Sequence, residues 1–202
     1  MSTRCSRLDL DRVLAAVAKP PCRAAAEREV TEAQLLAKAN EMARRGYEHS
    51  AESLRALEEW LRGRGLVVFG DVGVGKTFFF QCLRFPLEPL EGDHGGTIRL
   101  FRMADVVGMG VRELQEELDS LAPCEVAFDD VGAEPVFNEY GSRWEAFPWM
   151  VERRLRTDAK THFTTNLTPE ELCRRYGNRT VDRMHELARS VVLHGRSRRA
   201  TR

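Results

Sequence analysis

The segment GDVGVGKT, residues 70–77, has residue types and spacing that suit binding of nucleotide phosphates. Its glycines let the backbone fold into a nest of N–H groups around phosphate oxygens, and a helix starting near Lys76 adds its positive dipole end. Lys76 would reach the β- and γ-phosphates, and Thr77 would offer its hydroxyl to Mg²⁺. A chance glycine-rich turn is disfavoured because a strand pattern precedes the segment and a helix pattern follows it. The predicted nucleotide-binding residues are Gly70, Asp71, Val72, Gly73, Val74, Gly75, Lys76, Thr77 and Phe78.

A second candidate for a role in catalysis is the segment VAFDDVG, residues 126–132, an apolar run followed by two adjacent acids. Ligands of parallel sheets sit at the carboxyl ends of the strands, so Asp129 is expected beside the phosphates, as a partner of Mg²⁺. Asp130 is then the candidate that polarises the attacking water. A helix N-cap or a surface turn is the alternative explanation for these acids.

Strand and helix patterns alternate from Leu66 onward, and these segments hold both sets of candidate residues. Strands are predicted at residues 66–69, 97–103, 125–132, 161–166 and 190–195. Helices are predicted at residues 77–85, 111–121, 147–156 and 168–177, with a turn-rich connection at 86–96. The last of these helices has Thr168 as its N-cap and Glu171 at capping-box spacing. This alternation predicts an α/β fold with a parallel sheet covered on both faces.

The first sixty residues have helical patterns. The segment 8–19 is amphipathic and stops at two prolines, whereas 31–45 begins with Thr31 and Gln34 at capping-box spacing. A third helix is predicted at 51–62. These patterns predict a small helical segment in front of the sheet.

Bulk composition excludes several classes of protein. Lys+Arg and Asp+Glu both number 31 among 202 residues, so the net charge is zero and any DNA contact must come from a local basic patch. The five cysteines are scattered, which suits a reducing compartment, and no apolar stretch approaches transmembrane length. We therefore expect a cytoplasmic protein with no membrane contact.

Five segments occur in an order that resembles AAA+ P-loop ATPases, and most closely the DnaC/IstB-like branch of replicative helicase loaders and transposition helper ATPases. They are GLVVFGDVGVGKT, VAFDDVGAE, THFTTNLTPEEL, NRTVDRM and GRSRR. The resemblance spans roughly residues 54–199 and implies a three-layer P-loop NTPase (AAA+) fold with a parallel sheet. It implies an ATPase domain at 51–202 behind an N-terminal segment, residues 1–50, that is a candidate partner-binding region. Since the chain ends three residues after Arg199, no C-terminal lid is expected.

The resemblance also assigns roles to single residues. Asn166 matches sensor 1, which orients the hydrolytic water; on local pattern alone, a turn residue before the capped helix is the alternative. Arg183 matches the arginine finger that such proteins insert into a neighbouring subunit's site. Arg179 is its rival, and a solvated helix face is the alternative for both. Arg199 matches the sensor 2-like arginine, but the basic tail around it could equally contact DNA phosphates.

The resemblance implies an ATPase that uses ATP and Mg²⁺, self-associates on ATP binding, and acts on a replicative helicase or a transposase. In that branch the second acid after the strand is often aspartate, so Asp130 fits a working enzyme whose hydrolysis is slow alone and stimulated by a partner or DNA. The alternative is a nucleotide-gated binding module with little hydrolysis. A small-molecule kinase is disfavoured by the TTN segment before a capped helix. Aromatic residues in 137–150 suit either base stacking on single-stranded DNA or packing contacts.

Overall fold

The centre of the protein is a five-stranded parallel sheet with strand order β2-β3-β6-β1-β7. This computed structural model describes residues 28–84, 98–106, 109–134, 136–139, 142–195 and 197. The strands are β1 (Gly65–Phe69), β2 (Arg99–Arg102), β3 (Val126–Val131), β6 (Thr161–Thr165) and β7 (Ala188–Val192). All five predicted strands are therefore present, and they form the parallel sheet that the alternating pattern predicts.

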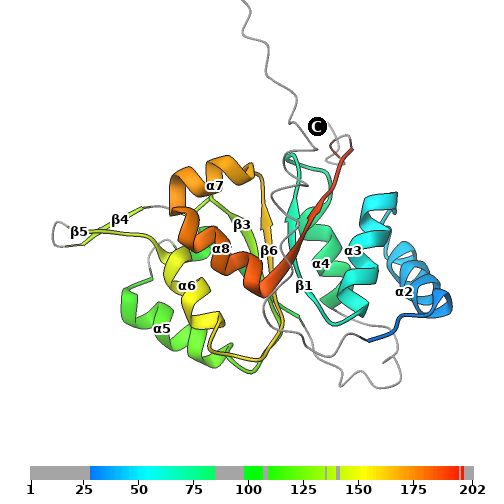
Figure 1. Ribbon diagram of the computed structural model, residues 1–202, viewed down its shortest axis with the longest axis horizontal. Helices are drawn as coiled ribbons and strands as arrows, with labels where there is room; N and C mark the ends of the chain where they lie inside the picture. The colour runs from blue at the N-terminus through cyan, green and yellow to red at the C-terminus, as the bar shows by residue number, and fades with distance from the viewer. Residues whose placement is uncertain are drawn as a thin grey trace, which may run out of the picture.

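Helices cover both faces of the sheet, so the fold has three layers (Figure 1). One face carries α2 (Glu32–Arg44), α3 (Ala51–Leu61) and α4 (Lys76–Arg84). The other carries α5 (Val111–Ser120), α6 (Ala146–Arg154), α7 (Pro169–Tyr176) and α8 (Asn178–Leu187). Successive residues of β1 serve the two faces: Leu66 and Val68 pack with the first group of helices, whereas Val67 and Phe69 pack with the second. A strand buried on both faces explains its continuous apolar run.

Helix α2 belongs to the same core as the sheet. Its Ala39 and Met42 are buried in one cluster with Leu66 of β1 and Phe79 of α4. Residues 28–50 thus pack on the sheet layer, and a partner-binding role for residues 1–50 stays a prediction.

Helix starts follow the local signals. The capping boxes at Thr31 with Gln34 and at Thr168 with Glu171 are both present, which confirms those predictions. Ser50 and Ser53 form a further capping box that the sequence analysis did not identify. In each case a side-chain oxygen satisfies an N–H group that the first helical turn leaves unpaired.

Some boundaries differ from the predictions. Strand β2 is shorter than expected because the chain enters a 3₁₀ turn, η1, at Met103–Val106. Strand β7 begins at Ala188, two residues early, because it pairs with β1 from Gly65 onward. An antiparallel hairpin, β4 (Phe137–Glu139) and β5 (Ser142–Trp144), was not predicted; it projects from the sheet beyond α6 (Figure 1). The predicted helix at 8–19 and the connection at 86–96 lie outside the described residues.

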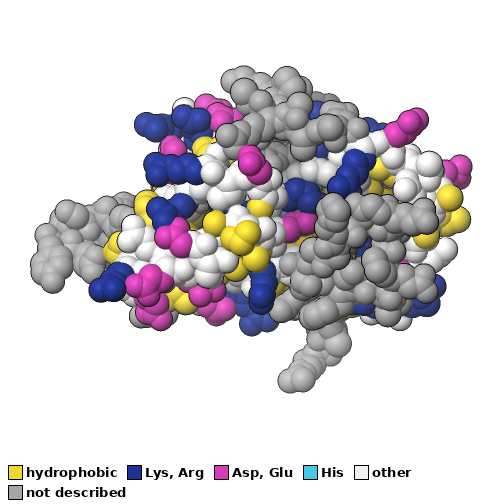
Figure 2. All heavy atoms as spheres, turned by 90° about the horizontal axis from the view of Figure 1, so that it is seen from below, with side chains coloured by type: hydrophobic (Ala, Val, Ile, Leu, Met, Phe, Trp, Pro, Cys, Tyr) yellow, Lys and Arg dark blue, Asp and Glu magenta, His cyan; other side chains and the backbone are white. Residues whose placement is uncertain are grey.

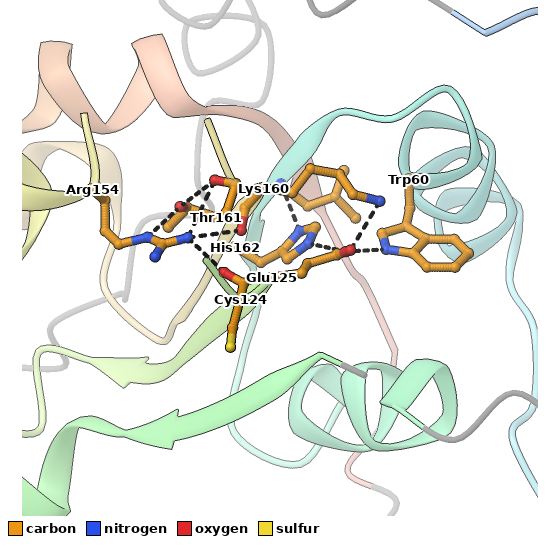
Figure 3. Close-up of polar contacts among 9 residues, drawn as sticks. Trp60, Cys124, Glu125, Arg154, Lys160, Thr161 and His162 are labelled. Atoms are coloured by element: carbon orange, nitrogen blue, oxygen red, sulfur yellow. Dashed lines mark hydrogen bonds and ion pairs between the residues drawn. The ribbon is translucent and has the colours of Figure 1, made fainter. Parts of the chain in front are cut away.

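A cluster of hydrogen-bonded polar side chains lies at the edge of the sheet where β3 and β6 begin (Figure 3). Glu125 accepts hydrogen bonds from Trp60 Nε1 at 2.7 Å and His162 Nε2 at 2.8 Å, and it pairs with Lys160 at 3.0 Å. His162 is fully buried, and its Nδ1 accepts the Leu66 N–H at 3.1 Å, so the other nitrogen carries the proton. This buried-edge cluster, as we call Trp60, Glu125, Lys160 and His162, joins α3 to the sheet.

Arg154 stabilises the same edge from the other face of the sheet (Figure 3). Its buried guanidinium donates to Leu121 O at 2.9 Å, Cys124 O at 3.0 Å and Thr161 Oγ1 at 2.8 Å. Burial lowers the pKa of Arg154. Arg154 therefore links the end of α6 to the segments that lead into β3 and β6.

The molecular surface has mixed charge. On the face shown in Figure 2, the Lys and Arg side chains of the described residues are interspersed with Asp and Glu side chains. Within the described ranges, no helix combines the length and apolar character needed to cross a membrane.

Candidate functional site

The loop between β1 and α4 is held in a tight conformation by the segment that follows β7. Gly73 has φ +89°, and a Cβ there would lie 2.2 Å from Ser197 Oγ. A Cβ on Gly70 would lie 2.5 Å from Leu193 O, and Leu193 N–H donates to Phe69 O at 2.8 Å. Side chains at these positions would displace the loop, so glycine is required for this close approach.

Lys76 lies at the start of α4, where the first N–H groups of a helix lack partners within the helix. Its ammonium group donates to Gly70 O at 2.7 Å, Asp71 O at 2.9 Å and Asn166 Oδ1 at 2.6 Å. Two of these acceptors belong to the loop itself, so the lysine charge is held at the loop, next to the positive end of the helix. This arrangement attracts anions.

Thr77 meets Asp129 at the end of β3. The Thr77 hydroxyl donates to Asp129 Oδ1 at 2.9 Å, and the Thr164 hydroxyl donates to the same oxygen at 2.7 Å. Asp129 is only 5% exposed. Because Thr77 gives its proton to the carboxylate, its oxygen lone pairs remain available to a cation, and hydroxyl and carboxylate oxygens are the ligands that Mg²⁺ prefers. Thr77 and Asp129 therefore fit a magnesium site.

Asp130 adopts an unusual backbone conformation. Its φ is +62°, the only positive value among the non-glycine residues that the structure describes. Its N–H donates to Thr164 Oγ1 at 2.8 Å, and its carboxylate accepts a hydrogen bond from Asn166 Nδ2. Non-glycine residues in this region are strained and cluster at functional sites. Lys76, Asn166 and Asp130 thus form one hydrogen-bonded chain.

These groups surround a cavity of about 880 Å³, in the size range of small-molecule sites. Its lining includes eight of the predicted site residues: Val72, Gly73, Gly75, Lys76, Thr77, Phe78, Asp130 and Asn166. The sequence analysis missed Gly46, Glu48, Gln81, Thr164, Gly195 and Ser197. Gln81 had a usable signal, since it lies four residues after Thr77 on the same face of α4. Glu48 belongs to a segment without a motif, whereas Ser197 lies in the GRSRR segment, in which only Arg199 was assigned a role.

The remaining predicted loop residues contribute differently. The Val74 side chain is buried in the core, so only its backbone faces the loop, and Asp71 is exposed and offers its carbonyl to Lys76. Gly70 supplies the other carbonyl.

Arg183 and its rival Arg179 are not among the residues that line this cavity. On α8, Arg183 pairs with Glu186 at 3.1 Å and lies 3.9 Å from Glu152, and Arg179 lies 3.3 Å from the same Glu152. Both face α6, away from the cavity of their own chain, so the finger role stays a prediction that concerns a neighbouring subunit. Arg199 lies outside the described residues.

The turn after β3 is braced by α7. Glu134 is 3% exposed; it accepts the Gly132 N–H at 2.9 Å and the hydroxyl of Tyr176. Arg175 donates to Gly132 O. Burial, reinforced by the Glu134 charge, raises the pKa of Tyr176 far above its ordinary value, so its hydroxyl keeps its proton. These contacts attach the turn that follows the paired acids to α7.

Comparison with known proteins gives both sequence and structural relatives. No protein-family model matches the chain. The chain is 26% identical over 175 residues to the replicative helicase loader DnaI of Bacillus subtilis strain 168, covering 76% of this chain and 53% of that protein. This chain thus spans about half the length of that relative.

Two solved structures share the fold. A crystal structure of the DnaC helicase loader matches with TM-score 0.55 and 18% identity, over 78% of this chain and 99% of that chain. A crystal structure of DnaI matches with TM-score 0.51 and 19% identity, over 81% of this chain and 84% of that chain. At these identities the structures show a common P-loop NTPase fold. Together with the sequence match to DnaI, they support the resemblance of this chain to the DnaC-like branch of the AAA+ P-loop ATPases.

Proposed function

We propose that the protein is an ATPase that couples ATP binding and hydrolysis to the loading of a replicative helicase. The observation that carries the proposal is that three separate segments bring Lys76, Asp130 and Asn166 to one cavity beside a glycine loop, with Asp129 bonded to Thr77 of the same lining. Separate strands deliver the acids and the asparagine to the same edge of the sheet, where ligands of such folds bind.

Each group has a role in attack of water on the γ-phosphate. The loop N–H groups and Lys76 bind the phosphates, and Thr77 with Asp129 would hold Mg²⁺, which when bound neutralises β- and γ-phosphate charge. Asp130 accepts the proton of the attacking water, and Asn166, bonded to both Lys76 and Asp130, orients these groups. Aspartate is one methylene shorter than glutamate, so we expect slow intrinsic hydrolysis.

The partner is inferred from the relative that is named a replicative helicase loader. A helicase is thus the first candidate and a transposase the second. Arg183 and Arg179 lie on the face of α8 turned toward α6, outside their own cavity. We therefore propose that ATP binding drives self-association and that Arg183 enters the site of a neighbouring subunit, where a guanidinium stabilises the transferring phosphoryl group.

Steady-state ATP hydrolysis by the purified chain, alone and with single-stranded DNA or the replicative helicase of its host, tests the proposal. We expect a low basal rate that a partner raises. Lys76→Ala should lose nucleotide binding, whereas Arg183→Ala should keep binding and lose turnover by about 10³-fold, the range for an arginine finger. Arg179→Ala is the matched control and should retain most of the turnover.

Two results would count against parts of this proposal. Normal turnover of Arg183→Ala would exclude the shared site. Tight ATP binding without hydrolysis under every condition would favour a nucleotide-gated binding module, because ordering of the loop that follows β3 would then be the only output. If the Lys76→Ala chain copurified with a transposase, the partner would be the transposase and not a helicase.

A further inference from the structure

A β-bulge lies at the paired acids. In the pairing of β3 with β6, Phe128 lies opposite Phe163 and Val131 lies opposite Thr165, so β3 has one more residue than β6 between these pairs. In a regular strand, Asp129 and Asp130 would point to opposite faces of the sheet. A bulge re-aims side chains, which explains how Asp130 lines the cavity while Asp129 bonds to a residue of the same cavity lining.

The bulge leaves a backbone group without its usual ladder partner. The Asp130 N–H donates instead to a side chain, Thr164 Oγ1, at 2.8 Å. The φ of +62° at Asp130 is costly for a non-glycine residue and persists only where the surroundings enforce it. Thr164 is 1% exposed, so solvent does not replace this hydrogen bond.

The same hydroxyl bonds to the other acid. Thr164 Oγ1 donates to Asp129 Oδ1 at 2.7 Å, the oxygen that also accepts from Thr77. A threonine hydroxyl has one proton and two lone pairs, so it serves both acids at once. One side chain therefore fixes the carboxylate of Asp129 and the backbone of Asp130.

Neighbouring threonines of β6 have other partners. Thr165 donates to Val131 O at 2.7 Å and accepts the Leu167 N–H at 3.0 Å, and Thr161 contacts Arg154 at the opposite end of the strand. Among the threonines of β6, Thr164 alone bonds to the acids.

We infer that Thr164 is a positioning residue that pins the bulge and aims both acids at the bound nucleotide. The inference rests on the proposed ATPase function. Residues that orient metal-binding groups in this way typically affect metal affinity or activity by about 10- to 100-fold. Thr164→Val keeps the shape of the side chain and removes both hydrogen bonds, whereas Thr164→Ser retains the hydroxyl.

Three measurements on the full chain test the inference: turnover, the Mg²⁺ concentration for half-maximal binding of a fluorescent ATP analogue, and amide exchange at Asp130. For Thr164→Val we expect turnover about 10- to 100-fold lower, a Mg²⁺ requirement about 10-fold higher and faster exchange at Asp130. Thr164→Ser should restore all three to within about threefold. Thr161→Val, a buried threonine of the same strand with two hydrogen bonds, is the control and should change neither the Mg²⁺ requirement nor the Asp130 exchange.

A Thr164→Val chain with wild-type Mg²⁺ dependence and Asp130 exchange would overturn the inference. A Thr164→Ser chain as impaired as Thr164→Val would also overturn it, because the hydroxyl would then not be the active feature. A wild-type chain that never hydrolyses ATP would refute the ATPase proposal instead. In that case the Mg²⁺ requirement for nucleotide binding and the Asp130 exchange still decide the role of Thr164.

Discussion

Strands β3 and β6 have polar groups at both ends of the sheet. Those at the starts of the strands are enclosed, whereas those at their ends face a cavity. Where β3 and β6 begin, Glu125 and His162 are enclosed, and they bond to Trp60, to Lys160 and to each other (Figure 3). Where these strands end, Asp130 and Asn166 border a cavity open to a ligand, and Asp129 bonds to Thr77 of the same lining. Buried polar groups with fixed partners stabilise a fold, whereas polar groups facing a cavity can exchange partners for a substrate.

The two edges also differ in backbone geometry: pairing is regular at the buried edge and irregular at the cavity edge. The buried-edge cluster lies where β3 and β6 begin, and the strands are regularly paired there, since Val126 aligns with both Arg99 and Thr161. The cavity edge has the bulge and the left-handed Asp130. Strain at one edge is tolerated because the regular, well-bonded edge stabilises the same strands, as expected when local rules are broken at a functional site.

Among the changes at the buried edge, we expect Glu125→Ala to lower the free energy of unfolding most. The change leaves Trp60 Nε1 and His162 Nε2 without their acceptor and Lys160 without its counter-ion, so the free energy of unfolding should fall by about 3 kcal/mol. Urea denaturation measures this loss. The nucleotide affinity of the folded fraction should stay within about twofold of the wild-type value, because changes at distant sites without shared partners act independently.

Glu116→Ala, which removes an exposed glutamate of α5, is the control and should change stability by less than about 0.5 kcal/mol. If Glu125→Ala kept its stability but lost nucleotide binding, the separation of the two edges would be wrong.

A smaller effect is expected in the pH dependence of stability. Burial lowers the pKa of His162 below its ordinary value of 6.5. The unfolded chain therefore binds a proton that the folded chain does not, and stability is full above about pH 6.5 and falls as the pH drops below it, by up to about 1.4 kcal/mol per pH unit. His162→Gln should reduce this slope, as measured by urea denaturation between pH 7 and pH 5.

His185 contributes in the same direction, because burial also lowers its pKa, so part of the slope should remain in His162→Gln. The exposed His194 provides a control: His194→Gln should leave the slope of the wild-type chain intact. An unchanged slope in His162→Gln would show that the buried-edge cluster tolerates a charged imidazole.

Local patterns predicted most of the fold. Five apolar runs became the five strands of the sheet, and Thr168 with Glu171 capped α7 as its spacing indicates. The glycine-lysine loop lies between β1 and α4, where its motif predicted it. These features depend on neighbours within a few residues, which a sequence displays directly.

Features that depend on distant pairs were not predicted. The bulge at Asp129 and Asp130 exists only relative to β6, and Glu125 meets Trp60 across 65 positions of the chain. The role of His162 as a donor to Glu125 likewise depends on the register of two strands. The hairpin of β4 and β5 went unrecognised because its aromatic residues were interpreted as packing or base-stacking groups.

Asp130→Asn tests the claim that Asp130 accepts the proton of the water that attacks ATP. Asparagine tolerates the left-handed conformation and keeps the side-chain shape, so only the carboxylate is lost. In single-turnover hydrolysis with the helicase and single-stranded DNA, we predict wild-type nucleotide affinity and cleavage slower by about 10²-fold or more. Cleavage by Asp130→Asn at the wild-type rate would contradict the claim.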